Sequence, residues 1–314
     1  MIRAENSLAP AAVTVTYEPD PAWPGRLHAI CRLSSRCIVV DNSLTPDARA
    51  FVHRTVEEIE GAELITNSGN PGLGRALNQG FGVLHAAGHP WVIAFDQDST
   101  PHPGLADALL ATATAGARPV AVAGANWQDT NRPGFASRHL CAAAPFGCGF
   151  HRLIADRDVT DVVCVITSGS LFSTKAWHEL GGFDEMLFLD LVDTDFCLRA
   201  RRAGWVIAVS AAAGLDHQRG AKQPVRFLGR TYFPSFISPS RLRGLWCNQL
   251  RLLRRHGWRE RAWVAYEMVY AAKLIADIVL LEDQKAAKLA ACVRGTWHGL
   301  VGRVAPVRTN AETK

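Results

Sequence analysis

The chain has 314 residues, of which 48% are hydrophobic and 20% are charged, a composition typical of folded globular proteins and unlike that of disordered ones. Lys and Arg outnumber Asp and Glu by 34 to 29, and a formal net charge of +5 is too small to indicate a nucleic-acid-binding protein by itself. The length allows one large domain, or one domain followed by a smaller appendage.

Short strand-like runs alternate with helical runs from residue 11 to about residue 125. Strands are predicted at 12–17, 38–40, 62–66, 91–95 and 120–123, and helices at 46–59, 74–87 and 104–115. Thr45 followed by Pro46 is a typical beginning of a helix. This alternation predicts an α/β fold, with a mostly parallel sheet covered by helices on both faces.

The pattern becomes irregular between residues 126 and 161, where Pro and Gly are frequent, and we expect a functional loop or lid there. After it we expect a strand at 162–167, helices at 174–180 and 194–203, and a strand at 206–210. Helices rich in Arg and Trp follow from about residue 236. We therefore expect an α/β domain in residues 1–235 and a helical extension in residues 236–314.

The cysteines and the N-terminus suggest a cytoplasmic protein. No two of the eight cysteines form a C-x-x-C pair, and several of them, such as Cys37 and Cys164, lie in apolar runs. Buried, reduced thiols explain this better than a zinc site. Residues 1–10 contain no apolar run of the kind found in secretory signals. Three charged residues interrupt residues 262–281, which disfavours a membrane-spanning helix.

Acidic residues stand where ligands bind in open α/β sheets, beyond the carboxyl ends of strands. Asp41 follows one predicted strand, and Asp96 and Asp98 follow another. Two carboxylates separated by one residue can converge on Mg²⁺ or Mn²⁺, which would neutralise the charge on a leaving diphosphate. A solvated turn is the alternative, but the position after a buried strand favours the metal site. His217 could complete the coordination, or it could be a structural histidine.

A third acidic group, Asp190, Asp193 and Asp195, stands at the beginning of a predicted helix. Carboxylates stabilise the N-terminus of a helix, which is one explanation for this group. The other is that one of them is a general base that takes the proton of an acceptor hydroxyl. The residues alone leave both explanations open.

Eight short motifs, in one order along residues 13–220, resemble those of the family 2 glycosyltransferases of the GT-A type, and among these the bacterial rhamnosyltransferases. The motifs are Val15–Tyr17, Val39–Asn42, Asn70–Gly80, Asp96–Ser99, Thr167–Ser170, Gly181–Glu185, Val192–Arg199 and His217–Gly220. Val192 departs from the pattern, because many members have Glu at this position. The segment after Ser238 also departs from that of similar proteins.

The resemblance implies a GT-A nucleotide-diphospho-sugar transferase fold, Rossmann-like and with a C-terminal helical extension. It implies that Asp193 is the catalytic base and that Mg²⁺ or Mn²⁺ binds at Asp96, Asp98 and His217. The residues expected to contact the nucleotide sugar are Thr16, Tyr17, Asp41, Asn70, Asn78 and Asp96. The residues expected on the acceptor side are Gly169, Ser170 and Asp195.

The predicted function is inverting transfer of L-rhamnose from dTDP-L-rhamnose to a lipid-linked glycan acceptor, in the synthesis of O-antigen or a similar surface polysaccharide. The donor follows from the resemblance alone, so transfer of another sugar from a UDP-sugar stays open. A nucleotidyltransferase is disfavoured, because residues 13–24 lack a Gly-rich, basic phosphate loop. A catalytically silent binding module is disfavoured by the joint presence of the carboxylates and His217.

The extension contains seven arginines between Arg241 and Arg261, opposed by Glu260 alone, with Trp246, Trp258 and Trp263 among them. Basic residues mixed with tryptophans favour an anionic membrane surface, and we expect peripheral contact at the inner face of the cell membrane. A solvated helix face with tryptophans in the core is the alternative. Nucleic acid is not an expected partner, because no known binding module accompanies the charge.

Overall fold

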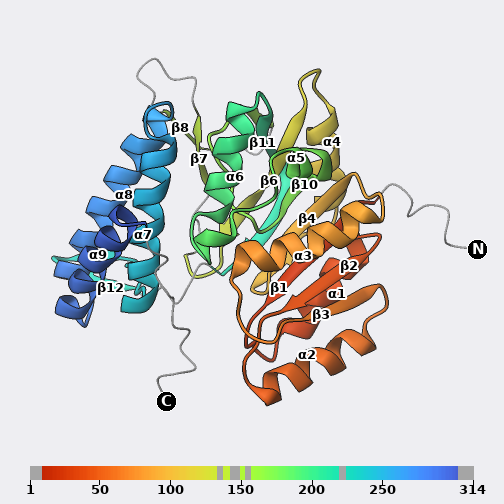
Figure 1. Cartoon of the computed structure of the whole chain (residues 1–314), viewed down its shortest axis with the longest axis horizontal. Helices are drawn as coiled ribbons and strands as arrows, with labels where there is room; N and C mark the ends of the chain where they lie inside the picture. Colours follow the sequence, from red (N-terminus) through yellow and green to blue (C-terminus); the bar gives the residue numbers. More distant parts are fainter. Residues whose placement is uncertain (1–8, 133–136, 142–148, 153–156, 219–223, 303–314) are drawn as a thin grey trace, which may run out of the picture.

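A computed structural model of the chain describes residues 9–132, 137–141, 149–152, 157–218 and 224–302 (Figure 1). The first eight residues, parts of the expected loop at 126–161, and Gly220 lie outside the described residues.

A nine-stranded sheet forms the centre of the α/β part of the chain. The strands follow the order β3-β2-β1-β4-β10-β6-β11-β5, and β9 pairs with β11 beside this path. Their bounds are β1 Ala11–Thr16, β2 Cys37–Asp41, β3 Ala62–Thr66, β4 Trp91–Asp96, β5 Ser99–Pro101, β6 Val120–Asp129, β9 Val159–Thr160, β10 Ser170–Ser173 and β11 Val206–His217. Strands β3, β2, β1 and β4 pair in parallel, as do β6 and β11, whereas β10 runs antiparallel between β4 and β6. The mostly parallel sheet is thus confirmed.

Helices cover both faces of this sheet, as expected, because its strands bury side chains in both directions. The helices are α1 Trp23–Leu33, α2 Pro46–Glu58, α3 Leu73–Ala86, α4 Leu105–Thr114, α5 Thr174–Glu179 and α6 Val192–Arg202, with a 3₁₀ turn η2 at Glu185–Leu187. Val13 of β1 belongs to one core, which it shares with α3, α5 and α6. Ala12, its neighbour, belongs to the other core, which it shares with α1, α2 and α4. Alternate strand residues thus anchor opposite helix layers.

The structure differs from the sequence prediction in three places. The strand expected at 162–167 was wrong: apart from one bridge at Val162 this segment is irregular, and the strand here is Ser170–Ser173. Helix α1 was not expected, although Trp23, Leu27 and Ile30 lie on one helical face and are buried. Strand β6 continues into the stretch expected to be irregular, and β7 (Arg138–Cys141) pairs with β8 (Gly149–Arg152) there.

The C-terminal part is helical, as its sequence predicted, and its three helices stand together beside the sheet (Figure 1). They are α7 Pro239–His256, α8 Arg261–Leu280 and α9 Lys285–Leu300, preceded by a hairpin of β12 (Val225–Phe227) and β13 (Arg230–Tyr232). Glycines let α9 approach α7 closely, since a Cβ on Gly295 would lie 2.4 Å from the Arg243 carbonyl oxygen. Trp263 of α8 is fully buried in the core that contains α6. Among the described residues, no helix has the length and hydropathy needed to cross a membrane.

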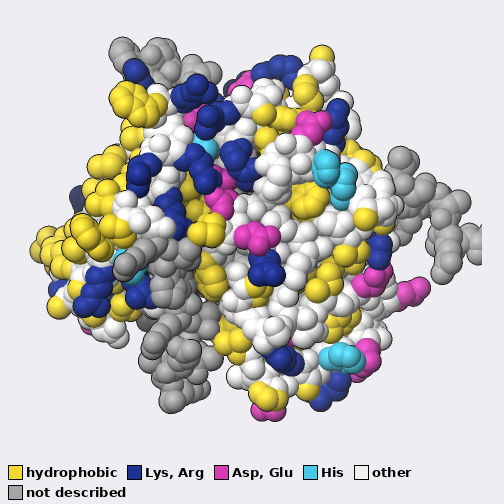
Figure 2. All heavy atoms as spheres, in the orientation of Figure 1, with side chains coloured by type: hydrophobic (Ala, Val, Ile, Leu, Met, Phe, Trp, Pro, Cys, Tyr) yellow, Lys and Arg dark blue, Asp and Glu magenta, His cyan; other side chains and the backbone are white. Residues whose placement is uncertain are grey.

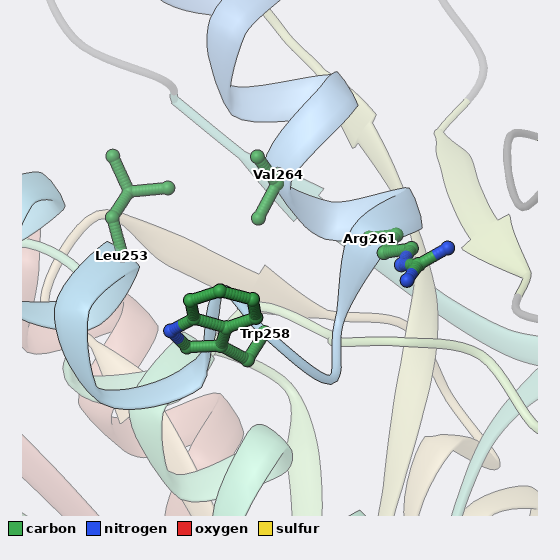
Figure 3. Close-up of a pocket in the computed structure, with 5 residues that line it drawn as sticks. Leu253, Trp258, Arg261 and Val264 are labelled. Atoms are coloured by element: carbon green, nitrogen blue, oxygen red, sulfur yellow. The ribbon is translucent and has the colours of Figure 1, made fainter.

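A pocket of about 340 Å³ opens at the junction of α7 and α8 (Figure 3). Leu253 of α7 and Val264 of α8 lie on either side of it, with Trp258 between them in the connecting turn. The pocket is lined by Leu253, Gly257, Trp258, Arg261 and Val264, so none of the predicted site residues contributes to it.

Candidate active site

The carboxyl ends of β1, β2 and β4 bring three predicted site residues to one edge of the sheet. Thr16 is paired with Asp41 in the β1·β2 register, and Val15 is paired with Asp96 in the β1·β4 register. Asp41 is buried, and its Oδ1 accepts a hydrogen bond from the Ser43 amide at 2.9 Å. The parallel pairing therefore places Thr16, Asp41 and Asp96 side by side, where α/β folds bind ligands.

Gln97, which was not predicted as a site residue, holds the end of β1 against the end of β4. Its Oε1 accepts hydrogen bonds from the Thr16 hydroxyl at 2.9 Å and from the Tyr17 amide at 2.7 Å. Its Nε2 donates to the Tyr17 carbonyl at 3.1 Å, and its own carbonyl accepts from Arg26. The residue between the two aspartates thus fixes the side chain of Thr16 and the backbone of Tyr17.

The predicted metal ligands Asp96, Asp98 and His217 come together in the structure. Each offers one ligand atom, and these atoms all lie within 4.8 Å of one another. Strand pairing explains this, because β5 runs antiparallel to β11 with Ser99 opposite His217. His217 Nδ1 lies 3.2 Å from Asp98 Oδ1 and 2.8 Å from the Ser99 hydroxyl.

The electrostatics of this cluster suit a divalent cation. The pKa of Asp96 is raised to about 6, mainly by burial and also by the charges of Asp98 and Asp193, whereas His217 lowers it in part. Two carboxylates held close together in a partly buried site repel each other, and a bound cation offsets that repulsion. Carboxylate oxygens with one imidazole are a donor set that Mg²⁺ and Mn²⁺ accept. These residues therefore form a candidate metal site, as predicted.

Asp193 lies in the first turn of α6 and connects to the strand ends through one loop. Its Oδ1 accepts from the Thr194 amide at 2.7 Å, and its Oδ2 accepts from the Thr167 amide at 3.3 Å. Burial raises the pKa of Asp193, although the amide hydrogen bonds of Thr194 and Thr167 lower it in part. A carboxylate with a raised pKa is a stronger base than an ordinary aspartate.

Ser168, next to Thr167, joins this loop to the metal cluster. Its hydroxyl accepts a hydrogen bond from the Asp96 amide at 3.0 Å and donates to the Ser99 hydroxyl at 2.7 Å. Ser168 was part of a recognised motif, but only its neighbours Gly169 and Ser170 were predicted as site residues. The motif was thus a signal for this segment, but the sequence alone does not show which of its hydroxyls faces the strand ends.

Gly169 and Ser170 are buried and have structural roles here. Gly169 has φ +68°, and a Cβ at this position would lie 2.6 Å from a Leu215 methyl group, so only glycine fits. Its turn lets β10 enter the sheet antiparallel to β4. The Ser170 hydroxyl donates to the Ile166 carbonyl at 2.6 Å. Contact of these residues with an acceptor stays a prediction.

The two predicted asparagines also hold loops in place. Asn78 makes four hydrogen bonds: its amide donates to the Phe183 carbonyl and Glu185, and its Oδ1 accepts from Trp177 and the Phe183 amide. These contacts use its full hydrogen-bonding capacity. Asn70 Oδ1 accepts from the Gly72 amide at 3.0 Å and lies 3.4 Å from Asn42 Nδ2. Neither arrangement supports or tests the predicted contact with a nucleotide sugar.

Asp195, predicted on the acceptor side, is 0% exposed and ties α6 to α7. Its Oδ2 pairs with Arg199 at 2.6 Å, and its Oδ1 pairs with Arg255 at 2.9 Å and His256 at 3.0 Å. Burial alone would raise the pKa of Asp195, but the His256 hydrogen bond and the two guanidinium charges lower it to about 2. Both oxygens are therefore occupied, and the predicted acceptor contact gains no support from this geometry.

Helix α7 also contacts the segment that precedes Asp193. The Asn248 amide donates to the Leu187 carbonyl at 2.7 Å and to the Asp190 carbonyl at 2.9 Å, and Arg241 pairs with the Asp190 carboxylate at 2.8 Å. Asp190 and Asn248 thus hold helix α7 against the segment before Asp193. Sequence analysis did not single out Asn248.

Two proteins of known activity are similar to this chain in sequence. An N-acetylglucosaminyl-diphospho-decaprenol L-rhamnosyltransferase of Mycobacterium tuberculosis is 26% identical over 271 residues, covering 76% of this chain and 87% of that protein. The dTDP-rhamnosyl transferase RfbF of Shigella flexneri is 25% identical over 212 residues, covering 67% of this chain and 69% of that protein.

Solved glycosyltransferase structures share the fold. The mannosyltransferase PcManGT of Pyrobaculum calidifontis, solved with GDP-Man and Mn²⁺, superposes with a TM-score of 0.57 at 14% identity, covering 94% of this chain and 88% of that one. GalNAc-T7, solved with UDP, GalNAc and Mn²⁺, gives a TM-score of 0.59 at 12% identity, covering 95% and 56%. The GT-A fold is thereby confirmed.

A family model described as glycosyltransferase like family 2 matches residues 27–230, which include the strand ends, the metal cluster and Asp193. This match spans well over half of the chain. The chain therefore belongs to the family 2 glycosyltransferases and is an enzyme of that class.

Proposed function

We propose that this glycosyltransferase inverts configuration as it moves L-rhamnose from dTDP-L-rhamnose to a lipid-linked glycan in surface polysaccharide synthesis. The observation that carries the reaction type is the convergence of Asp96, Asp98 and His217 within 4.8 Å, with Asp193 connected to them through residues 167–168. The two rhamnosyltransferase relatives support the donor, and the name of the mycobacterial relative supports a lipid-diphosphate acceptor.

The proposed chemistry assigns one task to each group. Asp96, Asp98 and His217 would hold Mg²⁺ or Mn²⁺, which neutralises the charge that develops on the leaving diphosphate. The Asp193 carboxylate takes the proton of the acceptor hydroxyl as its oxygen attacks the anomeric carbon. The bond to the diphosphate breaks on the opposite face, so a single displacement inverts the configuration. Asp41, Thr16 and Tyr17 lie at the adjacent strand ends and are proposed to bind the nucleotide.

We also propose that the two parts of the chain have different roles. Residues 1–235 form the transferase unit, and residues 236–314 form an extension whose helix α7 braces the segment before Asp193. A lipid-linked acceptor places the reaction at a membrane surface, so we propose a cytoplasmic enzyme that works at the inner face of the cell membrane.

The test is release of nucleotide from a panel of dTDP-, UDP- and GDP-sugars with Mg²⁺ or Mn²⁺, using membrane extract as the source of acceptor. Selective turnover of dTDP-L-rhamnose supports the proposal, and selective turnover of a UDP-sugar would overturn the donor assignment. Calorimetric titration of dTDP in the presence of each cation provides a second measurement. No turnover and no cation-dependent nucleotide binding would together overturn the proposed function.

A further inference from the structure

Helix α8 turns an apolar stripe to the solvent. Met268, Val269, Val279 and Leu280 are exposed, and the shorter exposed side chains between them, Ala272 and Ala276, are also apolar. At about 100° of rotation per residue, these positions fall within about 120° of the helix circumference. Globular proteins normally turn such a stripe to the core, so this face needs another explanation.

Helix α9 repeats the pattern. Val293 is 71% exposed and Trp297 is 61% exposed, and with Leu300 they follow the spacing i, i+4, i+7 on one face of the helix. The opposite side of α9 carries Gly295 and Gly299, which pack against the backbone of α7. Figure 2 shows hydrophobic side chains gathered over this helical part of the molecule, at the left of the view. We call the exposed apolar side chains of α8 and α9 the outer face.

Charge on these two helices is distributed by sign. The acidic residues of α8, Glu267 and Asp277, are buried, and Glu267 accepts a hydrogen bond from Gln249 of α7. Within Arg261–Leu280 and Lys285–Leu300, both described throughout, no acidic residue is exposed. Two basic residues, Lys273 and Arg294, are exposed and stand at the margins of the two apolar stripes. Lys273 pairs with the buried Asp277 of its own helix, so Arg294 is the cation on which the positive charge of this face mainly rests. The outer face is thus apolar in the middle, positive at its margins and without negative charge.

We propose that the outer face docks on the surface of a bilayer that contains anionic lipid. Helices that lie in a membrane interface have this combination of an apolar stripe, a tryptophan and flanking basic residues. Lys and Arg at the margins reach anionic headgroups while the apolar side chains enter the boundary of the acyl chains. The proposal rests on the proposed function for its setting, because a lipid-linked acceptor would reach the enzyme from that surface.

This surface differs from the arginine-rich run that the sequence favoured. At least four of those seven arginines bind partners within the chain: Arg241 pairs with Asp190, Arg255 pairs with Asp184 and Asp195, and Arg251 and Arg254 donate to backbone carbonyls. Trp263 is fully buried. Much of the run therefore holds the protein together. Trp258 of the run is exposed, but the apolar stripes lie on α8 and α9.

Charge also decides between a bilayer and a second copy of the chain. A twofold dimer through the outer face would bury Arg294 of both copies against a surface whose helices expose no acidic side chain to pair with it. An anionic surface attracts the same cation. Charge complementarity thus favours lipid.

The experiment is co-sedimentation of the full chain with phosphatidylcholine vesicles, with and without phosphatidylglycerol, at low salt. We expect binding to the anionic vesicles, and Val293→Asp should lower the partition coefficient at least about tenfold. Val83→Asp is the matched control, because it makes the same change on an exposed position of helix α3. Arg294→Gln should lower partitioning about fivefold on anionic vesicles only. Circular dichroism checks that each variant is folded.

Equal binding of Val293→Asp and wild type would overturn the proposal, as would no binding by the wild type. A concentration-dependent dimer that Val293→Asp dissociates, without vesicle binding, would assign the outer face to a second copy instead. Vesicle binding needs no nucleotide sugar, so this outcome is independent of the donor assay. Vesicle binding by a chain that neither turns over a nucleotide sugar nor binds a nucleotide with a cation would leave the docking surface standing and remove the proposed function.

Discussion

Replacing Asp195 by Asn separates a structural role from a role in acceptor binding. The carboxylate is fully buried and contacts Arg199, Arg255 and His256, which join α6 to α7. Asparagine has nearly the same shape but no charge, so it leaves Arg199 without its carboxylate partner and leaves Arg255 with Asp184 alone. We therefore expect loss of stability, together with a smaller change in turnover that follows from the altered placement of α6.

The magnitude follows from the pKa of Asp195, which the partners lower from 3.8 to about 2. That difference corresponds to about 2.5 kcal/mol of folding free energy at neutral pH. Because the pKa is lower in the folded state than in the unfolded state, this stability is present above pH 3.8 and is lost as the pH falls toward 2. The Asn variant lacks the titrating group, so its deficit relative to wild type should shrink over that range.

Urea unfolding followed by circular dichroism measures the deficit at pH 7 and at several lower pH values. Asp161→Asn is the matched control, because Asp161 pairs with Arg118 on the surface, where such a pair contributes at most about 1 kcal/mol. Unchanged stability of Asp195→Asn, combined with a raised KM for the acceptor, would refute the structural interpretation and restore the predicted acceptor contact.

Three further predictions concern the base, the metal cluster and the helical extension. Asp193→Asn should lower kcat by about 10²- to 10⁴-fold. Because burial raises the pKa of Asp193, wild-type turnover should fall as the pH drops through that raised pKa. The residual turnover of the variant should not show this fall. EDTA should abolish turnover, and Ser99→Ala, which removes the hydroxyl 2.8 Å from His217 Nδ1, should weaken Mn²⁺ binding in titrations by about 10- to 100-fold. Gly295→Val should cost about 1–3 kcal/mol in urea unfolding, because its Cβ would lie 2.4 Å from the Arg243 carbonyl oxygen; unchanged values would contradict each expectation.

The sequence predicts the elements that local patterns specify. Strands β1, β2 and β4 are mainly apolar and largely buried, and Thr45 with Pro46 marks the beginning of α2, which the structure confirms. The strand misplaced at 162–167 shows the limit, because its apolar residues are buried without pairing in the sheet. The strand instead begins after Gly169, whose left-handed turn depends on the packing of Leu215 and is not visible in a local pattern.

The candidate metal cluster could be anticipated because its members stand at strand ends, and parallel strands end at one edge. The neighbours that hold the cluster could not. Ser168 and Ser99 are 69 residues apart and meet only because β10 inserts between β4 and β6 and β5 pairs with β11. Serines are common, and nothing in their local sequence distinguishes a hydroxyl that bonds to the site from one that faces water.

The arginine run was misjudged for the same reason, because its contacts with distant residues cannot be seen in the sequence. Seven basic residues in a short stretch look like a surface that binds an external anion, but the count of charges cannot show where their partners lie. Their partners include Asp184, Asp190 and Asp195, which stand in a different part of the chain and flank Asp193. The attraction between α7 and this acidic segment therefore helps to hold the candidate base in place. Because Arg241 and Arg255 pair with these carboxylates, replacing either of them would disturb the site as well as any contact with a membrane. Val293, Trp297 and Arg294 are exposed on α9, away from those ion pairs, so docking can be tested at these positions without disturbing the site.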